Sequence, residues 1–283
     1  MASSWSAWPA PAKLNLFLHV CGRRSDGYHE LQTAFQLLDY GDVVELRPRR
    51  DGAIERWAPP AGLAADDDLT VRAARALKAE AGVAAGADIR LRKRLPAGGG
   101  LGGGSSDAAT VLVALNELWG VGWGVEALAA LGLRLGADVP VFVRGFSAWA
   151  EGVGERLEPL PEPAGGWPWY LVVDPGAQVS TAAVFADPEL TRDSPPLKIS
   201  DLRKEGGRND CEAVVRRRWP EVDEALAWLS GYGAARMSGT GGCCFVPFAE
   251  QGQAQQALSA LPERWSGFVA RGVTHSTLRG AAA

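Results

Sequence analysis

The stretch Leu95-Pro-Ala-Gly-Gly-Gly-Leu-Gly-Gly-Gly-Ser-Ser-Asp-Ala-Ala109 places six glycines around one leucine and ends with two hydroxyls and an acid. Because glycine lacks a Cβ, this backbone can take φ angles above zero and let a ligand approach its N–H groups directly. The apolar run from Ala108 to Trp119 predicts a helix that Gly120 ends. Since the free N–H groups and the dipole of a helix N-terminus favour an anion, the stretch predicts a phosphate site.

Other glycine-rich phosphate sites fit this stretch less well. Gly98, Gly100 and Gly103 satisfy the dinucleotide-binding pattern G-x-G-x-x-G, but that site needs a buried parallel strand before the loop. Residues 87–95 instead alternate apolar and basic side chains, as an antiparallel strand with one solvated face does. A Walker A loop needs a lysine where Gly104 stands, and the His-Arg-Asp and Asp-Phe-Gly motifs of protein kinases are missing. A flexible linker would not end in a helix.

The composition is that of a globular protein with two domains. The 283 residues are 47% hydrophobic and 22% charged, and the chain exceeds the length of a typical single domain. The net charge of -4 predicts no general surface for nucleic acid. The four cysteines lack C-x-x-C spacing, which disfavours a zinc site or a disulfide framework. With no signal peptide pattern and no run of about 18 apolar residues, we expect a cytoplasmic protein without membrane contact.

The remaining chain predicts strands and helices in an α+β arrangement. Strict alternation over 12–20 predicts a half-buried strand with Lys13 and Asn15 on its second face, and residues 31–46 predict strands broken at 39–42. Pro140 favours a strand over 139–143, because proline bars helix continuation. Helices are expected over 66–80, 125–133, 209–218 and 221–229, and a Pro/Gly-rich domain boundary over 158–168.

Several motifs resemble those of the GHMP kinases, a family of ATP-dependent small-molecule kinases. They are the glycine-rich stretch, Pro11–Leu16, Asp26–His29, Leu135–Val143 and Ser238–Gly242, which together cover nearly the whole chain. The resemblance implies an N-terminal ribosomal protein S5 domain 2-like domain and a C-terminal ferredoxin-like α/β domain. On this basis we expect an ATP-binding domain over residues 1–157 and a substrate-side domain over residues 158–283.

The resemblance also implies a catalytic pair. The residues alone leave Asp138 open between a turn or cap aspartate and a catalytic acid. By resemblance, Asp138 matches the catalytic aspartate of the family and Lys13 matches its partner. Asp138 would then accept the proton of the attacking alcohol, while Lys13 stabilises charge on the reacting phosphoryl group.

A nucleotide site is implied in the same way. Similar kinases have an asparagine where this chain has Asp68, near the adenine. Mg²⁺ is expected to bridge the phosphates of ATP, with Ser106 as the one candidate protein ligand and phosphate and water as the main ligands. The residues expected to bind ATP are Lys93, Asp68, Leu69, Pro96, Ala97, Gly98, Gly99, Gly100, Leu101, Gly102, Gly103, Gly104, Ser105 and Ser106.

The order and spacing of the motifs resemble a member of the family whose substrate carries a cytidine diphosphate. By resemblance, His29 binds the cytosine edge through hydrogen bonds and Tyr28 stacks on the base, with Phe185 opposite Tyr28. The residues alone also allow Phe185 a place in the core. The residues expected to bind this substrate are Asn15, Tyr28, His29, Thr181, Phe185 and Gly239.

Three other functions stay open at this point, and we expect a monomer or a weak homodimer. A GHMP kinase of the homoserine or mevalonate type would share the glycine-rich loop without a cytosine pocket. A nicotinamide-dependent oxidoreductase would use the G-x-G-x-x-G match. An RNA-binding module would use the basic cluster of Arg90, Arg92, Lys93 and Arg94, although the net charge argues against it.

Overall fold

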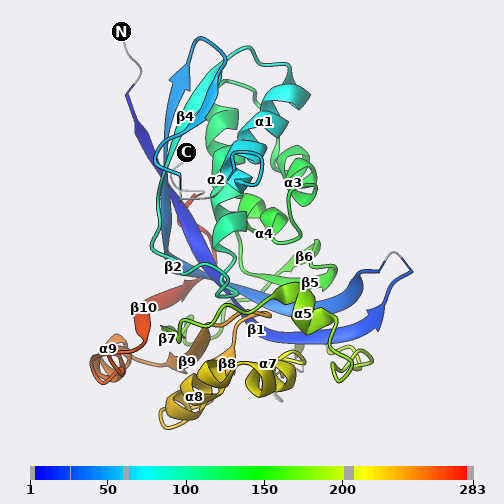
Figure 1. Cartoon of the computed structure of the whole chain (residues 1–283), viewed down its shortest axis with the longest axis vertical. Coiled ribbons are helices and arrows are strands. Elements are labelled where there is room, and N and C mark those ends of the chain that lie inside the picture. Colours follow the sequence, from blue (N-terminus) through cyan, green and yellow to red (C-terminus); the bar gives the residue numbers. More distant parts are fainter. Residues whose placement is uncertain (1–3, 26, 60–63, 201–206, 279–283) are drawn as a thin grey trace.

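The computed structural model describes residues 4–25, 27–59, 64–200 and 207–278. The molecule is elongated and has two halves, which are joined by two long antiparallel strands, β1 (Ser6–Arg23) and β2 (His29–Arg49) (Figure 1). Among the described residues, the strands of both halves form one 10-stranded sheet. Asp26, in the predicted motif between β1 and β2, lies outside the described residues. The predicted α+β fold is confirmed.

The expected break at residues 39–42 is wrong, because β2 continues through them. Gly41 allows the two strands to pass closely. A Cβ on Gly41 would lie 2.1 Å from the carbonyl oxygen of Ala10 on β1, so only glycine fits without moving the backbone. The pairing register shifts between Pro11 and Lys13, directly after this contact. A turn-like sequence, Asp39-Tyr-Gly-Asp42, therefore serves as a close crossing point inside a strand.

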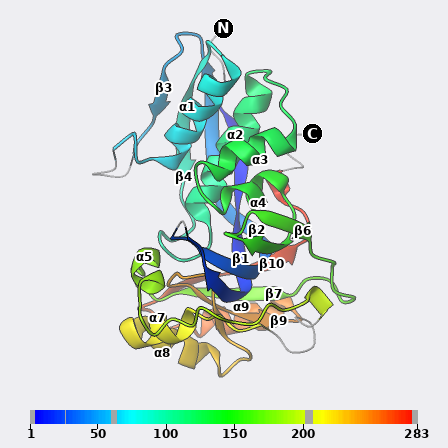
Figure 2. The same cartoon turned by 90° about the vertical axis from the view of Figure 1, so that its right-hand side faces the viewer.

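Four helices cover one face of the sheet in the N-terminal half (Figure 2). The central helix α2 packs residues such as Ala108, Leu112 and Leu115 into a core shared with β1, β2 and β4. The elements of this half are β3 (Ile54–Arg56), α1 (Leu69–Ala81), β4 (Gly86–Arg92), α2 (Gly103–Leu118), α3 (Val125–Leu133), α4 (Val139–Arg144), β5 (Ala148–Gly152) and β6 (Arg156–Pro159). The antiparallel pairing of β4 with β2 confirms the prediction for residues 87–95.

The strand predicted over residues 139–143 is wrong, since this segment forms helix α4. Pro140 lies in the first turn, where the N–H that proline lacks would have no partner within the helix. Proline disfavours the continuation of a helix that precedes it, but it fits the first turn of a new helix. Pro140 takes this second position in α4. Asp138 consequently occupies the position that precedes a helix rather than a strand.

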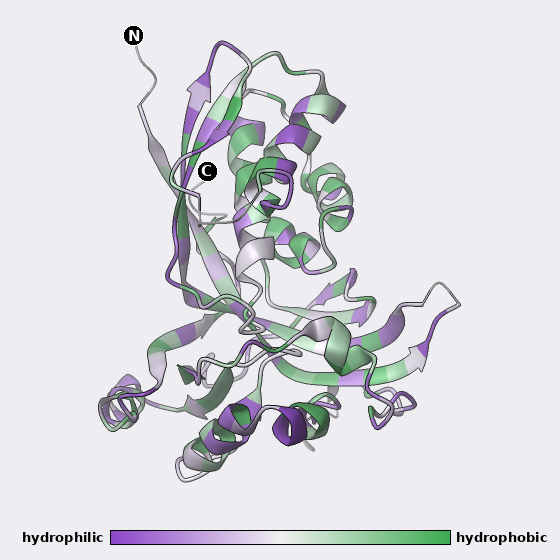
Figure 3. Ribbon diagram, viewed as in Figure 1, coloured by the Kyte–Doolittle hydropathy of each residue, from purple (hydrophilic) through white to green (hydrophobic). Residues whose placement is uncertain are grey.

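The C-terminal half is a sheet with helices on one face. Its strands run in the order β10-β7-β9-β8, and β10 also pairs with β2. As predicted, helix α8 buries Val222, Ala225, Leu226 and Leu229. In Figure 3, α8 is coloured as a mixture of hydrophilic and hydrophobic residues, which fits a helix with one buried face. The elements are β7 (Trp169–Asp174), α5 (Thr181–Phe185), α7 (Glu212–Arg218), α8 (Pro220–Leu229), β8 (Arg236–Met237), β9 (Cys244–Phe248), α9 (Gln251–Ser259) and β10 (Ser266–Val273).

The domain boundary between residues 157 and 158 stays a prediction. Strand β6 spans that position and pairs antiparallel with β5, so its last residues are tied to the N-terminal half. In the described part of the chain, no helix has the length and apolar character needed to cross a bilayer.

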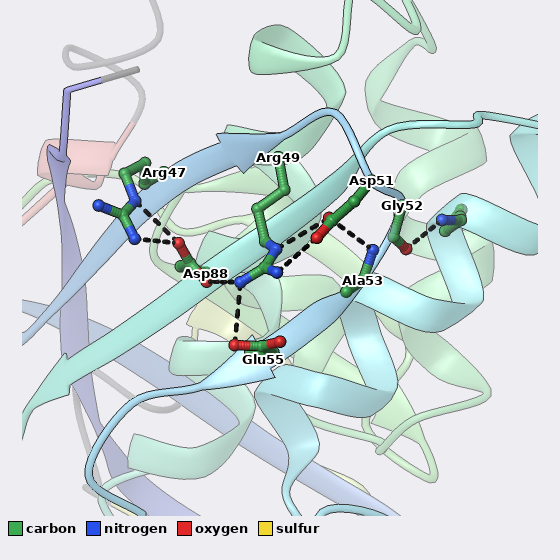
Figure 4. Close-up of polar contacts among 8 residues, drawn as sticks. Arg47, Arg49, Asp51, Gly52, Ala53, Glu55 and Asp88 are labelled. Atoms are coloured by element: carbon green, nitrogen blue, oxygen red, sulfur yellow. Dashed lines mark hydrogen bonds and ion pairs between the residues drawn. The ribbon is translucent and has the colours of Figure 1, made fainter. Parts of the chain in front are cut away.

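A charged network fixes the outer edge of the N-terminal sheet (Figure 4). Asp88 on β4 is buried, and Arg47 and Arg49 on β2 both pair with its carboxylate, with Arg49 Nη1 2.7 Å from Asp88 Oδ1. Arg49 also pairs with Asp51 and Glu55, on the turn to β3 and on β3 itself. A buried carboxylate requires such partners. The network thus ties the short edge strand to the sheet.

We predict that Gly41→Ala destabilises the fold by about 2 kcal/mol or more, because the added methyl group overlaps the backbone of β1. Urea unfolding measures this change. Gly124→Ala is the matched control, since a Cβ there meets nothing within 4 Å and its φ of -72° suits any residue. An unchanged free energy of unfolding for Gly41→Ala would contradict the close crossing.

Candidate active site

The glycine-rich loop leads directly into helix α2. Gly98, Gly100 and Gly102 take φ angles of 71°, 75° and 72°, which favour glycine. The helix begins at Gly103, earlier than the predicted Ala108, and its first turn consists of Gly103, Gly104, Ser105 and Ser106. Ser106 N donates to Gly102 O, so the N–H groups of the preceding positions lie before the first helical hydrogen bond. This geometry suits a phosphate.

A second glycine turn packs against this loop through the main chain. A Cβ on Gly100 would lie 2.0 Å from Ser238 O, and one on Gly241 would lie 2.1 Å from Gly100 N. Cys243 N donates to Gly99 O at 3.1 Å. Ser238 Oγ donates to Gly100 O at 2.9 Å. The turn between β8 and β9 therefore holds the glycine-rich loop in place through main-chain contacts and the Ser238 side chain.

The predicted catalytic residues lie together. Lys13 Nζ is 3.3 Å from Asp138 Oδ2 and donates to Gly100 O at 3.0 Å and to Asn15 Oδ1 at 2.5 Å. The Lys13 side chain is 4% exposed and that of Asp138 is 33% exposed. The ammonium group is thus held by three oxygens at the phosphate loop, and the carboxylate of Asp138 remains open to a ligand.

The half-buried strand expected for residues 12–20 is wrong, because both faces of this part of β1 are buried. Lys13 and Asn15 are 3% and 2% exposed, and Leu14 on the opposite face is fully buried. Asn15 Nδ2 donates to Thr33 Oγ1 at 2.9 Å, and Asn15 N donates to Ser238 Oγ at 3.2 Å. The polar face that resembled a solvated surface is an ordered set of hydrogen bonds around the site.

One pocket of about 340 Å³ connects these groups. The glycine loop and Lys13 lie on one side of it, and Thr181 and Phe185 of α5 lie on the other. Of the residues predicted to act in catalysis or binding, the pocket is lined by Lys13, Asn15, Gly100, Gly102, Ser105, Asp138, Thr181, Phe185 and Gly239. The pocket thus combines a cation, a carboxylate and main-chain groups of the glycine-rich loop with polar and aromatic side chains of α5, which suits a reaction between a phosphate donor and a second molecule.

The aromatic residues expected to bind the base lie near one another. Phe185 stacks on His29, with ring centroids 4.9 Å apart and an angle of 24° between the rings. The placement of a base between Tyr28 and Phe185 stays a prediction. Tyr28 is 64% exposed and lines a neighbouring pocket with Gly136 and Val153. Val153 lines both pockets, so the two are adjacent. Phe185 packs at the pocket wall and not in a closed core.

Arg192 holds this aromatic pair, a role that no sequence pattern indicated. Its Nε donates to His29 Nε2 at 3.3 Å, and its Nη2 donates to Phe185 O at 2.8 Å. Burial, then the charges of Arg192 and Arg23, lower the pKa of His29. His29 is therefore neutral at pH 7, and because Nε2 accepts from Arg192, its proton lies on Nδ1.

The expected nucleotide side is built around Lys93. Its ammonium group pairs with Asp42 Oδ2 and, at 3.1 Å, with Asp107 Oδ2, beside the first turn of α2. Leu69 lies against Gly104, 3.4 Å from the position of a Cβ there. Asp68 caps α1 and pairs with Arg56 at 3.2 Å. The contact of Asp68 with adenine stays a prediction, as do those of Lys93, Leu69, Pro96 and Ala97 with ATP.

Asp107, one of the two acids that pair with Lys93, has a raised pKa. Burial raises the pKa of Asp107 to about 7, the attraction of Lys93 opposes this, and the charge of Asp42 adds to it. The ammonium group of Lys93 therefore pairs with two carboxylates, those of Asp42 and Asp107. The sequence did not single out Asp42 or Asp107, although Asp107 directly follows the two serines of the loop.

The described residues offer few protein ligands for a metal ion near the glycine-rich loop. The Ser106 hydroxyl is buried and has no hydrogen-bond partner in the described part of the chain, whereas Ser105 lines the pocket. Among the described residues, no three His, Cys, Asp or Glu side chains group as metal ligands. Cys243 and Cys244 are buried in different core clusters, because adjacent residues of a strand point to opposite faces.

Two sequence patterns match the chain. That of the GHMP kinases N-terminal domain matches residues 68–146, and that of the GHMP kinases C-terminal region matches residues 197–267. The first begins at the cap of α1 and includes the glycine loop and Asp138. The chain belongs to the GHMP kinases.

Comparison with individual relatives identifies a narrower family within the GHMP kinases. The 4-diphosphocytidyl-2-C-methyl-D-erythritol kinase of Halorhodospira halophila is 67% identical over 276 residues, which are 98% of this chain and 96% of the relative. A crystal structure of 4-(cytidine 5'-diphospho)-2C-methyl-D-erythritol kinase has a TM-score of 0.81 and 36% identity, and covers 94% of this chain and 99% of its own. Within the GHMP kinases, the chain belongs to the family of these kinases.

A more distant structure shares the fold alone. The homoserine kinase of Cytophaga hutchinsonii has a TM-score of 0.71 at 16% identity, and covers 98% of this chain and 96% of its own. The general architecture is thus common to GHMP kinases that act on different substrates.

We predict that Gly100→Ala weakens ATP binding at least tenfold, because a methyl group there collides with the carbonyl of Ser238 and displaces the loop. Calorimetric titration with ATP measures this loss. Gly122→Ala is the matched control, since its φ of 74° equals that of Gly100 within a degree but a Cβ there meets nothing within 4 Å. The control should lose about 1 kcal/mol of stability and keep its ATP affinity. Equal ATP affinities for both variants would contradict the backbone contact.

We predict that Asp107 makes the folded protein less stable as pH rises from about 4 to about 7. The folded state keeps the proton on Asp107 up to its pKa of about 7, whereas the unfolded chain releases it near the ordinary value of 3.8. Asp107→Asn removes this slope, so its melting temperature should gain on that of the parent between pH 5 and pH 8.

Asp51→Asn is the control for this measurement. The Arg49 guanidinium lowers the pKa of Asp51 to about 2, so the effect of this acid does not change between pH 5 and pH 8. A difference between Asp107→Asn and the parent that stays constant with pH would refute the assignment.

Proposed function

We propose that this chain transfers the γ-phosphoryl group of ATP to the 2-hydroxyl of 4-diphosphocytidyl-2-C-methyl-D-erythritol, in the non-mevalonate route to isoprenoid precursors. The observation that carries the proposal is the Lys13–Asp138 pair at 3.3 Å, in one pocket with the glycine loop and the aromatic side chain that stacks on His29. Relatives of this name align over almost the full chain, which supports the same substrate.

The glycine loop and the start of α2 are proposed to bind the triphosphate. The main-chain N–H groups there offer hydrogen bonds without moving, so that phosphate oxygens can approach the backbone closely. Mg²⁺ would neutralise charge on the phosphates, held mainly by phosphate oxygens and water, with the hydroxyls of Ser105 and Ser106 as the available protein donors.

Asp138 is proposed to receive the proton of the attacking hydroxyl. Its carboxylate lies at the edge of the pocket, partly exposed, and Lys13 holds one of its oxygens. Lys13 also lies at the phosphate loop, next to Gly100 O, where it can stabilise the charge that develops on the transferred group. The acceptor is a tertiary hydroxyl, so alignment of the two reactants should contribute more than the strength of the base.

His29 is proposed to bind the cytosine edge. With its Nε2 engaged by Arg192, the imidazole offers Nδ1–H as a donor to an oxygen or nitrogen of the base. Thr181 and Thr240 share a hydrogen bond of 2.7 Å across the same pocket and provide further polar contacts. A cytosolic location and a monomer or weak homodimer remain predictions from the sequence.

We predict that Asp138→Asn lowers kcat by about 10²- to 10⁴-fold, because the amide cannot take the proton of the hydroxyl. Release of ADP in the presence of 4-diphosphocytidyl-2-C-methyl-D-erythritol measures kcat, and calorimetry should find ATP binding within about twofold of the parent. Asp223→Asn on the outer side of α8 is the control. Turnover retained by Asp138→Asn would remove this residue from the mechanism.

Competition by CDP tests the substrate separately. Homoserine and mevalonate kinases act on substrates without a cytosine, and only a pocket that binds cytidine should let CDP compete with the acceptor. ADP release that depends on homoserine or mevalonate, with no inhibition by CDP, would contradict the proposed acceptor while leaving the kinase class intact.

A further inference from the structure

A second pocket, of about 260 Å³, lies on the C-terminal sheet and contributes no residue to the site described above. Its walls are mainly apolar and include three aromatic side chains, those of Trp167, Tyr170 and Phe245. Leu16 of β1 and several prolines of the segment before β7 complete it. Its volume is at the lower end of the range for small-molecule pockets.

Strand register places several of the side chains that line this pocket on one face of the sheet. Tyr170 pairs with Pro247 and Arg236 pairs with Phe245, so all four side chains lie on one face. The opposite face carries Leu171, Val173 and Val246, which pack in the core cluster under α7, α8 and α9. In Figure 1 these helices lie below the sheet. On the other face, Tyr170 and Phe245 pack in a core cluster with Leu14 of β1, beside the pocket.

Two polar side chains of the pocket can donate hydrogen bonds to a ligand. Tyr170 is 3% exposed and lines the pocket, where its hydroxyl can donate a hydrogen bond. Burial raises the pKa of Tyr170, so the hydroxyl remains a donor at all physiological pH values. Arg236 donates to Leu16 O at 2.7 Å, and no carboxylate of the described residues pairs with it. A cation without a counter-ion favours an anion, and the Tyr170 hydroxyl can add a hydrogen bond to it.

We propose that this pocket binds a small apolar acid, a compact aromatic or branched hydrocarbon with one anionic head group, and that its occupancy regulates the kinase site. The aromatic and proline walls would bury the hydrocarbon, and Tyr170 and Arg236 would bind the head group. A neutral ligand of the same shape would leave Arg236 without a counter-ion.

The pocket is linked to the catalytic residues along two strands. Leu16 follows Asn15 on β1, and adjacent residues of a strand point to opposite faces, so Asn15 lines the kinase pocket and Leu16 the second one. Arg236 precedes Ser238 by two residues, and Ser238 Oγ holds Gly100 O. The Arg236–Leu16 hydrogen bond joins these strands at the second pocket, so a ligand there contacts both supports of the glycine loop.

Binding of 2-naphthoate to the full-length protein tests the site, with 2-naphthol as the neutral probe of matched shape. Calorimetry at pH 7 should find 2-naphthoate bound at least tenfold more tightly than 2-naphthol, and saturating ATP or CDP should not displace it. Displacement by either nucleotide, or equal affinities for the two probes, would overturn the proposal.

Variants locate the bound acid. Tyr170→Phe and Arg236→Gln should each weaken 2-naphthoate binding about tenfold, which corresponds to loss of one hydrogen bond to a charged group. Ala234→Phe should abolish binding, since its side chain fills the pocket from the rim. Tyr232→Phe on the exposed end of the α8 segment is the control and should bind as the parent does. Unchanged binding in all three pocket variants would refute the assignment.

Kinetics test the regulatory part. Saturating 2-naphthoate should change kcat or the KM for ATP of the parent at least twofold, and should have no effect on Ala234→Phe. Binding without a kinetic effect in the parent would refute regulation through β1 and β8.

Discussion

The contact between two glycine turns is the constraint on which the site depends. Gly100 and Gly241 meet main chain to main chain, where any Cβ would overlap, and Ser238 adds a side-chain hydrogen bond to the same carbonyl that Lys13 uses. The loop from the N-terminal half is thereby held by a turn from the C-terminal half. The position of the phosphate loop is therefore a property of both halves, and neither half alone would preserve it.

The ammonium group of Lys13 is held in a fixed position by oxygen atoms of the site. Its ammonium group is almost fully buried and contacts Asp138, Asn15 Oδ1 and Gly100 O, so its desolvation is offset by three oxygens before any ligand arrives. Asn15 is in turn oriented by Thr33. A cation held in one geometry needs no reorganisation when negative charge moves between phosphate and hydroxyl, which is the condition for electrostatic catalysis.

The sequence predicted the local features of the site because each had a local cause. The glycine loop, the existence of helix α1 and the buried face of α8 follow from backbone freedom and periodicity within a few residues. The failures have tertiary causes. The sequence predicts a break at residues 39–42, but β2 continues there because Gly41 lets β1 pass, with Ala10 O 2.1 Å from where a Cβ of Gly41 would lie. The alternation over residues 12–20 predicts a half-buried strand, but Lys13 and Asn15 are 3% and 2% exposed because other parts of the chain cover them. The stacking of His29 on Phe185 joins segments far apart in the chain, which no local pattern reports.

Strand β1 contributes side chains both to the kinase pocket and to the packing against the C-terminal sheet. It pairs with β2 along most of its length, so its side chains on both faces have fixed positions set by the sheet. One face carries Lys13 and Asn15 to the phosphate loop, and the other carries Leu14 and Leu16 to the C-terminal sheet. Because side chains on the two faces of a strand share one backbone, the packing of Leu14 and the position of Lys13 are set together. The two halves therefore meet in this strand as well as in the contact between the glycine turns.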